Sequence, residues 1–251
     1  MKNCIIGYTG FIGKNLIRQK KFSNFYNSKN IHNIHLQKFH TTIICAPHGK
    51  KWWANKYPKK DKIIVKKLIN NLKKIKTNKI ILISTIDVYN RKTYSNENSK
   101  IGFSKSNVYG NNRLKIEKFI SQKFENYHII RLPALFGNYL KKNILYDLMN
   151  NNNLHDVKLK SQFQWYFMKD LLTDINKIIK QDIKIINLFT EPISTLEIVN
   201  LFFKKKKKYL DKKNQGPKYN LKTIYSKNFK YKKGYIRGKK EILKKMKNYL
   251  K

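Results

Sequence analysis

The sequence of 251 residues has only two cysteines and no spacing of histidines that is typical of a metal site. Two cysteines cannot build the disulfide framework of a small secreted domain. Cys4 and Cys45 each lie in an apolar run typical of a buried strand, so we expect reduced core thiols. Because the His and Cys spacings match no ligand pattern, we predict no metal.

Long apolar runs are also missing. No run approaches the roughly 18 residues of a membrane span, and the apolar N-terminal stretch lacks the h-region and cleavage site of a signal peptide. We therefore expect a cytoplasmic protein with no membrane partner.

Acidic residues are scarce: 14 stand against 56 basic residues, which gives a formal net charge of +42. Only five of the basic residues are Arg, and the lysines are spread along the chain among many Asn and Ile, the residues of A/T-rich codons. Such a charge attracts polyanions in general, but a face that binds nucleic acid is typically Arg-rich and interleaved with aromatic residues. We predict no specific nucleic-acid partner, although a nucleic-acid role stays a third alternative.

What the chain does have is a folded composition, with 41% hydrophobic and 13% aromatic residues. Short β-branched runs alternate with longer helical patterns, which is typical of a parallel sheet covered on both faces. The sequence predicts an α/β fold, a Rossmann-type doubly wound parallel sheet. The expected strands are residues 3–7, 41–46, 79–85 and 127–133, and the expected helices are residues 11–21, 61–75 and 108–124.

The pattern loosens after Gly137. Residues 138–220 mix helical stretches with one more short strand at 184–189. We predict a dinucleotide-binding Rossmann core over residues 1–137 and a small C-terminal substrate lobe over 138–251, with elements that return to the core. In such sheets ligands bind at the carboxyl ends of the strands.

A glycine-rich loop follows the first expected strand and opens a helix. Its G-x-x-G-x-x-G pattern allows a tight turn at Gly7, close approach of a pyrophosphate at Gly10, and close helix packing at Gly13. We predict a dinucleotide site here, and a glycine-rich turn without a ligand is the alternative. The other loop residues expected at the cofactor are Thr9, Phe11 and Ile12.

A loop of this kind that binds NAD usually has an acidic residue about 20 residues later, but no acidic residue occurs before Asp61. The second strand instead ends near Asn27, Ser28 and Lys29. A hydroxyl and an ammonium there would accept a 2′-phosphate, which favours NADP. NAD held by Asn27 or Ser28 stays open.

Three further motifs follow in order: Ser84-Thr85 with Val88-Tyr89, then "YGNNRLKIE" at 109–117, then "RLPALFG" at 131–137. With the glycine loop, they resemble the extended short-chain dehydrogenase/reductases, the NAD-dependent epimerase/dehydratase family that acts largely on nucleotide sugars. The resemblance covers about residues 2–200. It implies NAD(P) as cofactor, a nucleotide-sugar substrate and a possible homodimer through the helices at 61–75 and 108–124.

The resemblance also implies site residues. Tyr109 matches the tyrosine that exchanges a proton with the reacting oxygen, and Thr85 matches the residue that hydrogen-bonds this oxygen. Ala46 and Pro47 would flank the cofactor, and Pro133 would border the nicotinamide. Ile86-Asp87 stands where the family's dehydratases have an Asp-Glu pair, which makes dehydration less favoured than reduction or epimerisation; the alternative for Asp87 is a helix or turn cap.

Arg113 stands where the family has a lysine. An arginine supplies the same positive charge, but its planar fork does not reproduce the lysine's bond to the nicotinamide ribose. Two readings follow. In the first, the chain is an NAD(P)-dependent oxidoreductase or epimerase with Thr85, Tyr109 and Arg113 as catalytic residues. In the second, it is a dinucleotide-binding sensor or structural protein with little catalysis, in which Arg113 only holds the cofactor.

Overall fold

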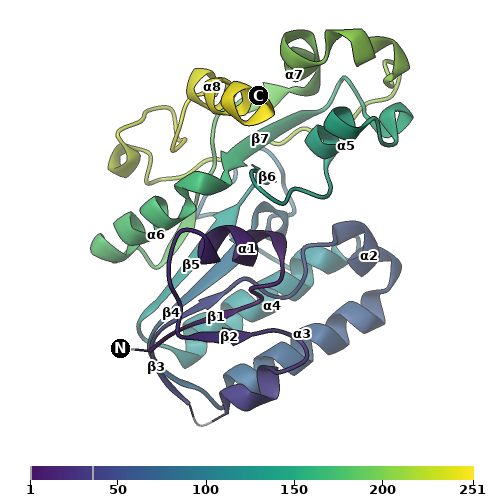
Figure 1. The fold of residues 1–251 in the computed structure, drawn as a ribbon. Helices are drawn as coiled ribbons and strands as arrows, with labels where there is room; N and C mark the ends of the chain where they lie inside the picture. The colour runs from purple at the N-terminus through teal and green to yellow at the C-terminus, as the bar shows by residue number, and fades with distance from the viewer. Residues whose placement is uncertain (1, 36) are drawn as a thin grey trace. The chain divides into compact units, whose positions relative to one another are not determined.

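The computed structural model describes residues 2–35 and 37–251, and its contacts divide the chain into two compact units (Figure 1). The first unit comprises Met1–Asn90, Lys100–Arg131 and Lys169–Ile186, and the second comprises Arg91–Ser99, Leu132–Met168 and Asn187–Lys251. Residues 169–186 therefore belong to the first unit, although they come late in the sequence. The boundary expected from the sequence, between residues 137 and 138, stays a prediction.

The strands form two sheets, one of six strands in the order β2-β1-β3-β4-β5-β8 and one of three strands in the order β6-β7-β9. In the first sheet, β1 pairs in parallel with β2 and β3, and β3 pairs in parallel with β4. The strands are β1 (Asn3–Ile6), β2 (Asn24–Tyr26), β3 (Lys38–Ile44), β4 (Lys76–Thr85), β5 (Tyr127–Leu132), β6 (Ala134–Phe136), β7 (Gln162–Phe167), β8 (Ile185–Asn187) and β9 (Pro192–Ser194).

The helices begin and end close to the predicted positions where the sequence pattern is long. The α-helices are α1 (Phe11–Ile17), α2 (Lys51–Lys56), α3 (Pro58–Leu72), α4 (Val108–Lys123), α5 (Ile144–Asn150), α6 (Leu171–Lys180), α7 (Thr195–Phe202) and α8 (Lys239–Leu250). The short 3-10 helices are η1 (Ile31–Ile34), η2 (Ile86–Val88), η3 (Leu154–Asp156), η4 (Met168–Asp170), η5 (Lys204–Tyr209) and η6 (Lys227–Phe229). No helix within residues 2–35 and 37–251 is long and apolar enough to cross a membrane.

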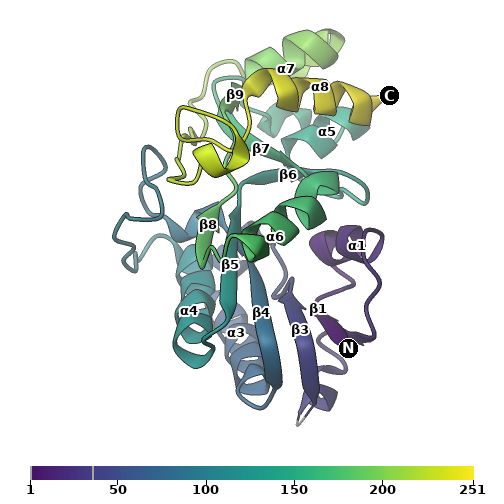
Figure 2. The same cartoon turned by 90° about the vertical axis from the view of Figure 1, so that its left-hand side faces the viewer.

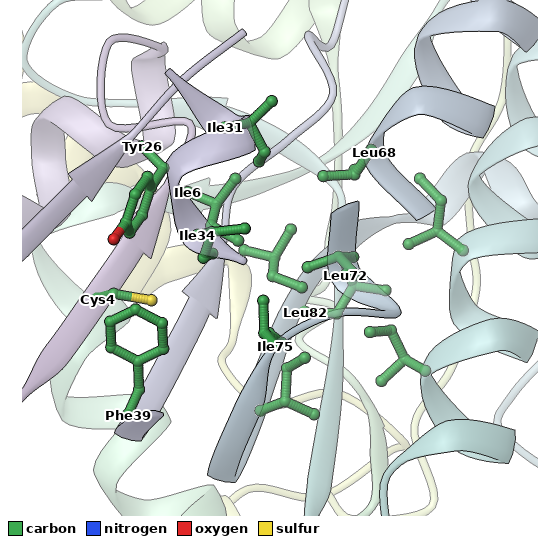
Figure 3. Packing of buried hydrophobic residues seen from close by; sticks show 14 of the residues in the cluster. Cys4, Ile6, Tyr26, Ile31, Ile34, Phe39, Leu68, Leu72, Ile75 and Leu82 are labelled. Carbon is green, nitrogen blue, oxygen red and sulfur yellow. The ribbon is translucent and has the colours of Figure 1, made fainter. Parts of the chain in front are cut away.

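Helices cover both faces of the six-stranded sheet, because its central strands are apolar on both sides. Side chains of a strand alternate between the two faces. Cys4, Ile6 and Leu82 pack on α3 and α4 in one hydrophobic cluster (Figure 3). The alternate side chains, such as Ile5 and Ile81, are equally buried, and α1 and α6 lie on that face (Figure 2). The predicted α/β doubly wound fold is confirmed.

Helix α3 differs from the sequence prediction at both ends, because it ends at Leu72 rather than at Ile75 and starts earlier than predicted. It begins at Pro58, a residue favoured in the first helical turn, rather than at Asp61. Its buried face carries Asp61, Val65, Leu68 and Leu72. An acidic side chain therefore occupies a core position in the first turn of this helix.

The second unit has its own core. Helices α5, α7 and α8 pack on the three-stranded sheet, and Phe136, Trp165 and Ile193 contribute the strand side chains of this cluster. Strand β7 pairs in parallel with β6 and antiparallel with β9. The second unit therefore contains a hydrophobic cluster of its own.

Candidate functional site

The glycine loop connects β1 to α1 at the point where the strand order of the sheet reverses. Strand β1 lies between β2 and β3, and the chain continues to β2 on one side and to β3 on the other. In doubly wound sheets this switch point is where ligands bind, beyond the carboxyl ends of the strands. The Gly7 amide donates to the Tyr26 carbonyl at 2.7 Å, so the loop leaves β1 close to the end of β2.

Two of the three glycines are required by the protein itself. Gly7 has φ +86°, and a Cβ there would lie 2.7 Å from the Cys45 carbonyl oxygen and 3.2 Å from the Ala46 Cβ. A Cβ on Gly13 would lie 2.3 Å from the Gly7 carbonyl oxygen. The contacts at 2.7 and 2.3 Å are shorter than real Cβ contacts, so Gly7 forms the turn and Gly13 lets α1 pack against the loop.

Gly10 is different. Its backbone is extended, with φ −78° and ψ 172°, and a Cβ there would meet nothing closer than the Gly7 carbonyl oxygen at 3.4 Å. The contacts inside the chain would therefore accept a methyl group at this position. A glycine that no steric contact inside the chain requires fits a loop whose backbone approaches an external group, and the predicted pyrophosphate is such a group. Thr9 is exposed, and Phe11 and Ile12 are half-buried at the start of α1.

The end of β2 forms a polar turn. The Asn27 carboxamide oxygen accepts from the Lys29 amide at 2.8 Å, and its nitrogen donates to the Tyr8 hydroxyl at 3.2 Å. The Asn27 side chain is therefore committed to shaping the turn. Ser28 and Lys29 are exposed and remain the side chains of this turn that are best able to contact a ribose or its phosphate.

Ala46 and Pro47 follow β3 and are half-buried. The short distance between Ala46 and the Cβ position of Gly7 places this segment against the glycine loop. The two segments expected to flank one cofactor are thus neighbours. Pro133 is buried in the second unit.

Thr85 ends β4 and caps the short helix η2, where its hydroxyl accepts from the Asp87 amide at 3.2 Å. The Asp87 carboxylate binds Lys51 Nζ at 2.6 Å, and a cap formed by Asp87 stays the alternative. A Cβ on Gly110 would lie 2.0 Å from the Asp87 carbonyl oxygen. The start of α4 consequently packs directly on η2, which brings Tyr109 beside the turn that follows Thr85.

Tyr109 is 7% exposed, near the start of α4. The Asn107 side chain caps this helix by accepting from the Gly110 amide at 3.1 Å and donates to the Asp87 carbonyl at 2.7 Å. The Tyr109 amide donates to the Asn55 side chain of α2 at 3.2 Å. Hydrogen bonds from two elements therefore fix the position of the tyrosine backbone.

The ionisation of Tyr109 is unfavourable in this surrounding. Burial raises the pKa of the phenol above its usual range, and the charges of Asp87 and Asp61 raise it further. The charge and hydrogen bond of Arg113 lower the pKa, but by less. The phenol is consequently protonated at neutral pH in the protein alone.

Arg113 lies one turn after Tyr109 and is 5% exposed. Its guanidinium carbon lies 4.3 Å from the centroid of the Tyr109 ring. Its two terminal nitrogens donate to the Asp61 carboxylate at 2.9 and 3.2 Å, and one of them also donates to the His48 carbonyl at 2.9 Å. The guanidinium is therefore stacked on the tyrosine and paired with a carboxylate of α3.

A second buried pair fixes α4 against the sheet. Arg131 of β5 donates to both Glu117 carboxylate oxygens and to the Tyr89 hydroxyl at 2.7 Å. The Ser84 hydroxyl donates to Glu117 at 2.5 Å. These four side chains come from three of the sequence motifs, and their bonds set the relative position of Thr85 and Tyr109.

Sequence reasoning missed several residues of this site, namely His48, Lys51, Asn55, Asp61, Asn107 and Asn112. Asp61 has a recognisable signal, because it is the first acidic residue of the chain and precedes Val65, Leu68 and Leu72 at helical spacing. Asn107 has the signal of a residue type that caps helices, directly before the predicted helix. The other four have no sequence signal that separates them from similar residues elsewhere in the chain.

Both cysteines are free thiols, as expected. Cys4 is fully buried in β1, and burial raises its pKa to about 12. Within residues 2–35 and 37–251, His, Cys, Asp and Glu side chains form no group of three or more that could hold a metal ion.

The sheet order, the glycine loop and the flanking helices define a Rossmann-type α/β fold. No family model matches the chain, and no curated protein matches it in sequence. Solved structures do match. A dTDP-4-dehydrorhamnose reductase from Yersinia enterocolitica is 14% identical with a TM-score of 0.73, and the match covers 99% of this chain and 98% of that one.

Two further structures show the same likeness. A dTDP-4-dehydrorhamnose reductase from Bacillus anthracis, in complex with NADP, is 18% identical over 94% of both chains, with a TM-score of 0.71. A UDP-glucuronic acid 4-epimerase from Bacillus cereus, in complex with NAD, is 16% identical over 92% of both chains, with a TM-score of 0.70. At these identities the likeness establishes the fold.

Proposed function

We propose that the chain is an NAD(P)-dependent oxidoreductase or epimerase that acts on a nucleotide-sugar-like substrate. The observation that carries the proposal is Gly10, a glycine that no steric contact inside the chain requires, in a loop at the switch point of the sheet. The turn after Thr85 and the start of α4 with Tyr109 pack together in the same unit. The solved structures of similar fold include a dTDP-4-dehydrorhamnose reductase in complex with NADP and a UDP-glucuronic acid 4-epimerase in complex with NAD.

The residues of the first unit fit such a cofactor. The loop from Gly7 to Gly13 would hold the pyrophosphate, with Ala46 and Pro47 against the same loop. The bound nicotinamide supplies or accepts a hydride. Tyr109 would move a proton between its hydroxyl and the substrate oxygen, and the Thr85 hydroxyl would orient this oxygen.

The choice of cofactor follows from the turn after β2. Ser28 and Lys29 are exposed, and the turn contains no carboxylate that would bind a ribose 2′-hydroxyl. A hydroxyl and an ammonium suit a 2′-phosphate, so we propose NADP as the preferred cofactor. NAD, with its ribose on Ser28, is the alternative.

A second function is favoured by one specific observation. Arg113, which would assist the catalytic tyrosine, is bound through both terminal nitrogens to Asp61. A dinucleotide-binding protein with little catalysis needs no such assistance. In this second candidate the chain is a sensor or structural protein, and its glycine loop binds the cofactor without turnover.

The test is turnover of NADPH with a 4-keto sugar nucleotide, in the unaltered chain and in Tyr109→Phe. We expect the phenylalanine variant to lose activity by about 10²–10⁴-fold, because general acid catalysis contributes that much. Tyr209→Phe is the matched control, since Tyr209 is 57% exposed in η5. Tight NADPH binding without turnover on a panel of sugar nucleotides would instead support the second candidate.

A homodimer that forms through α3 and α4, a substrate lobe in the second unit, a cytoplasmic location and the lack of a specific nucleic-acid partner stay predictions. Sedimentation of the purified chain measures the first of these directly. A monomer at micromolar concentration would contradict it.

A further inference from the structure

Asp61 is a charged residue of the site whose side chain is completely buried. It lies on the inner face of α3 and is 0% exposed. Its carboxylate accepts two hydrogen bonds from Arg113 and a third, at 2.8 Å, from the Asn112 side chain. Three hydrogen bonds, two of them from a guanidinium, therefore satisfy this buried carboxylate and fix its orientation.

The pairing determines what Arg113 can do. Both of its terminal nitrogens are committed to one carboxylate in a bidentate arrangement, and the guanidinium is fixed over the face of the Tyr109 ring at 4.3 Å. The positive charge next to the phenol is thus matched by the negative charge of its partner. An arginine at this position without Asp61 would present a full positive charge to the phenol.

The other charged groups around Tyr109 do not restore a net positive field. From η2 comes Asp87, whose carboxylate is paired with Lys51 of α2 at 2.6 Å. From the segment before α2 comes the exposed His48; partial desolvation and the charge of Arg113 lower its pKa below the usual value, which favours the neutral imidazole at pH 7. Each cation near the phenol is therefore accompanied by a carboxylate.

We propose that Asp61 is a positioning residue that, by pairing with Arg113, keeps Tyr109 in its proton-donating form and so favours reduction of a ketone over oxidation of an alcohol at neutral pH. The inference rests on the proposed function and narrows it to the reduction of a keto sugar nucleotide. An epimerase of this kind first oxidises an alcohol, and that step needs a tyrosinate as base. The protonated phenol described above is the form that serves as an acid.

The reduction balances as follows. A bound reduced nicotinamide would supply one hydride, which brings both electrons of the new C–H bond to the carbonyl carbon. The carbonyl π bond breaks toward oxygen, and this oxygen takes the Tyr109 proton, so that a C–H bond and an O–H bond form. The resulting tyrosinate regains its proton from solvent. In this proposal Asp61 affects the reaction only through Arg113 and does not contact the substrate.

The test measures the ionisation of Tyr109 directly, without turnover. Tyrosine labelled with carbon-13 at Cζ is incorporated in the whole chain, and the Tyr109 signal is assigned by its loss in Tyr109→Phe. We expect this signal to stay in its protonated form through neutral pH and to ionise above the usual value of about 10. In Asp61→Asn it should ionise at lower pH, because the positive charge of Arg113 then has no partner.

Two further variants complete the design. Asp61→Asn combined with Arg113→Met removes both charges, and the ionisation should return to high pH. Asp182→Asn is the control, because Asp182 lies in the same unit with its side chain 69% exposed and should leave the titration unchanged. The rate of alcohol oxidation in the unaltered chain should rise about tenfold per pH unit, since only the tyrosinate acts as base. In Asp61→Asn the same rise should begin at lower pH.

The outcomes separate this inference from the function on which it rests. A Tyr109 signal that ionises near neutrality in the unaltered chain overturns the role of Asp61, and so does an unchanged titration in Asp61→Asn. If that variant does not fold, the unaltered chain and the double variant decide. The expected titrations without any turnover on keto sugar nucleotides would end the proposed function while leaving the electrostatic effect of Asp61 established.

Discussion

The sharpest prediction compares two glycines of the same loop, Gly10 and Gly13, each changed to alanine. The two positions have opposite roles, because Gly13 is needed by the fold and Gly10 is not. A methyl group on Gly13 would lie 2.3 Å from the Gly7 carbonyl oxygen, whereas one on Gly10 would lie 3.4 Å from its nearest neighbour. The first contact forces the backbone to move, and the second is an ordinary van der Waals distance.

The expected effects on stability follow from these distances. Gly13→Ala should destabilise the chain by about 1–3 kcal/mol, the usual cost of overpacking, which corresponds to about 2–4 °C in Tm per kcal/mol for a chain of this size. Gly10→Ala should change stability by less than about 0.5 kcal/mol. Alanine is worse than glycine as an N-cap, but it also restricts the unfolded chain, and the two effects are similar in size.

The expected effects on binding are reversed. If the backbone at Gly10 approaches a pyrophosphate, the methyl group of the alanine variant would hold the pyrophosphate away from the loop and break a hydrogen bond between the loop and this charged group, worth about 1.5–3 kcal/mol. The Kd for NADPH should then rise about 10- to 150-fold. Thermal unfolding and calorimetric titration with NADPH measure the two quantities on the same samples. Gly102→Ala is the control, since a Cβ at Gly102 would meet nothing within 4 Å.

Two results would refute this reasoning. Unchanged NADPH affinity in Gly10→Ala would mean that the loop does not hold the pyrophosphate. A loss of stability in Gly10→Ala as large as that in Gly13→Ala would mean that a side chain at position 10 meets a close neighbour after all.

Three further predictions concern other parts of the first unit. Glu117→Gln should destabilise the chain by about 3–5 kcal/mol in chemical denaturation, because it leaves the charge of Arg131 buried without its partner; a change no larger than in Glu125→Gln, at an exposed site, would contradict the role of this pair. Cys4, buried and with a pKa of about 12, should resist alkylation by iodoacetamide at pH 8 in the native chain and react in urea, and rapid native labelling would show that β1 opens. Lys29→Ala should weaken NADPH up to about fivefold, the range of an exposed ion pair, and leave NADH unaffected, whereas equal loss of both would remove the argument for NADP.

The sequence is sufficient for the long elements of the first unit. Helix α4 begins at the predicted residue, and β4 and β5 lie within one to three residues of their predicted bounds. These elements are continuous apolar runs or long helical patterns, whose local signal is strong. The three-residue strands β6 and β9 and the six-residue helix α2 have no such signal. These short elements depend on contacts with distant segments of the chain, and a local sequence pattern does not predict such contacts.

The candidate site likewise has residues that the sequence predicts and contacts that only the structure shows. Gly7, Thr85 and Tyr109 follow from the order of motifs, and the tight turn expected after the first strand already explains a glycine at position 7. The motif also predicts different roles for Gly10 and Gly13, and the structure adds the distances on which the difference depends: a Cβ would lie 3.4 Å from the Gly7 carbonyl oxygen at position 10 and 2.3 Å from it at position 13. The Lys51–Asp87 pair has no sequence signal, since 36 residues separate its members.

The sequence by itself determined the class of fold and the residues that resemble a catalytic set, because hydrophobic periodicity and motif order are local properties of the chain. Only the tertiary structure decided the state of that set. The motif alone predicts a positive charge beside Tyr109, but α3 lies beside α4 and places a buried carboxylate on the Arg113 guanidinium. The sequence separates Asp61 from Arg113 by 52 residues, and electrostatics depends on distance in space.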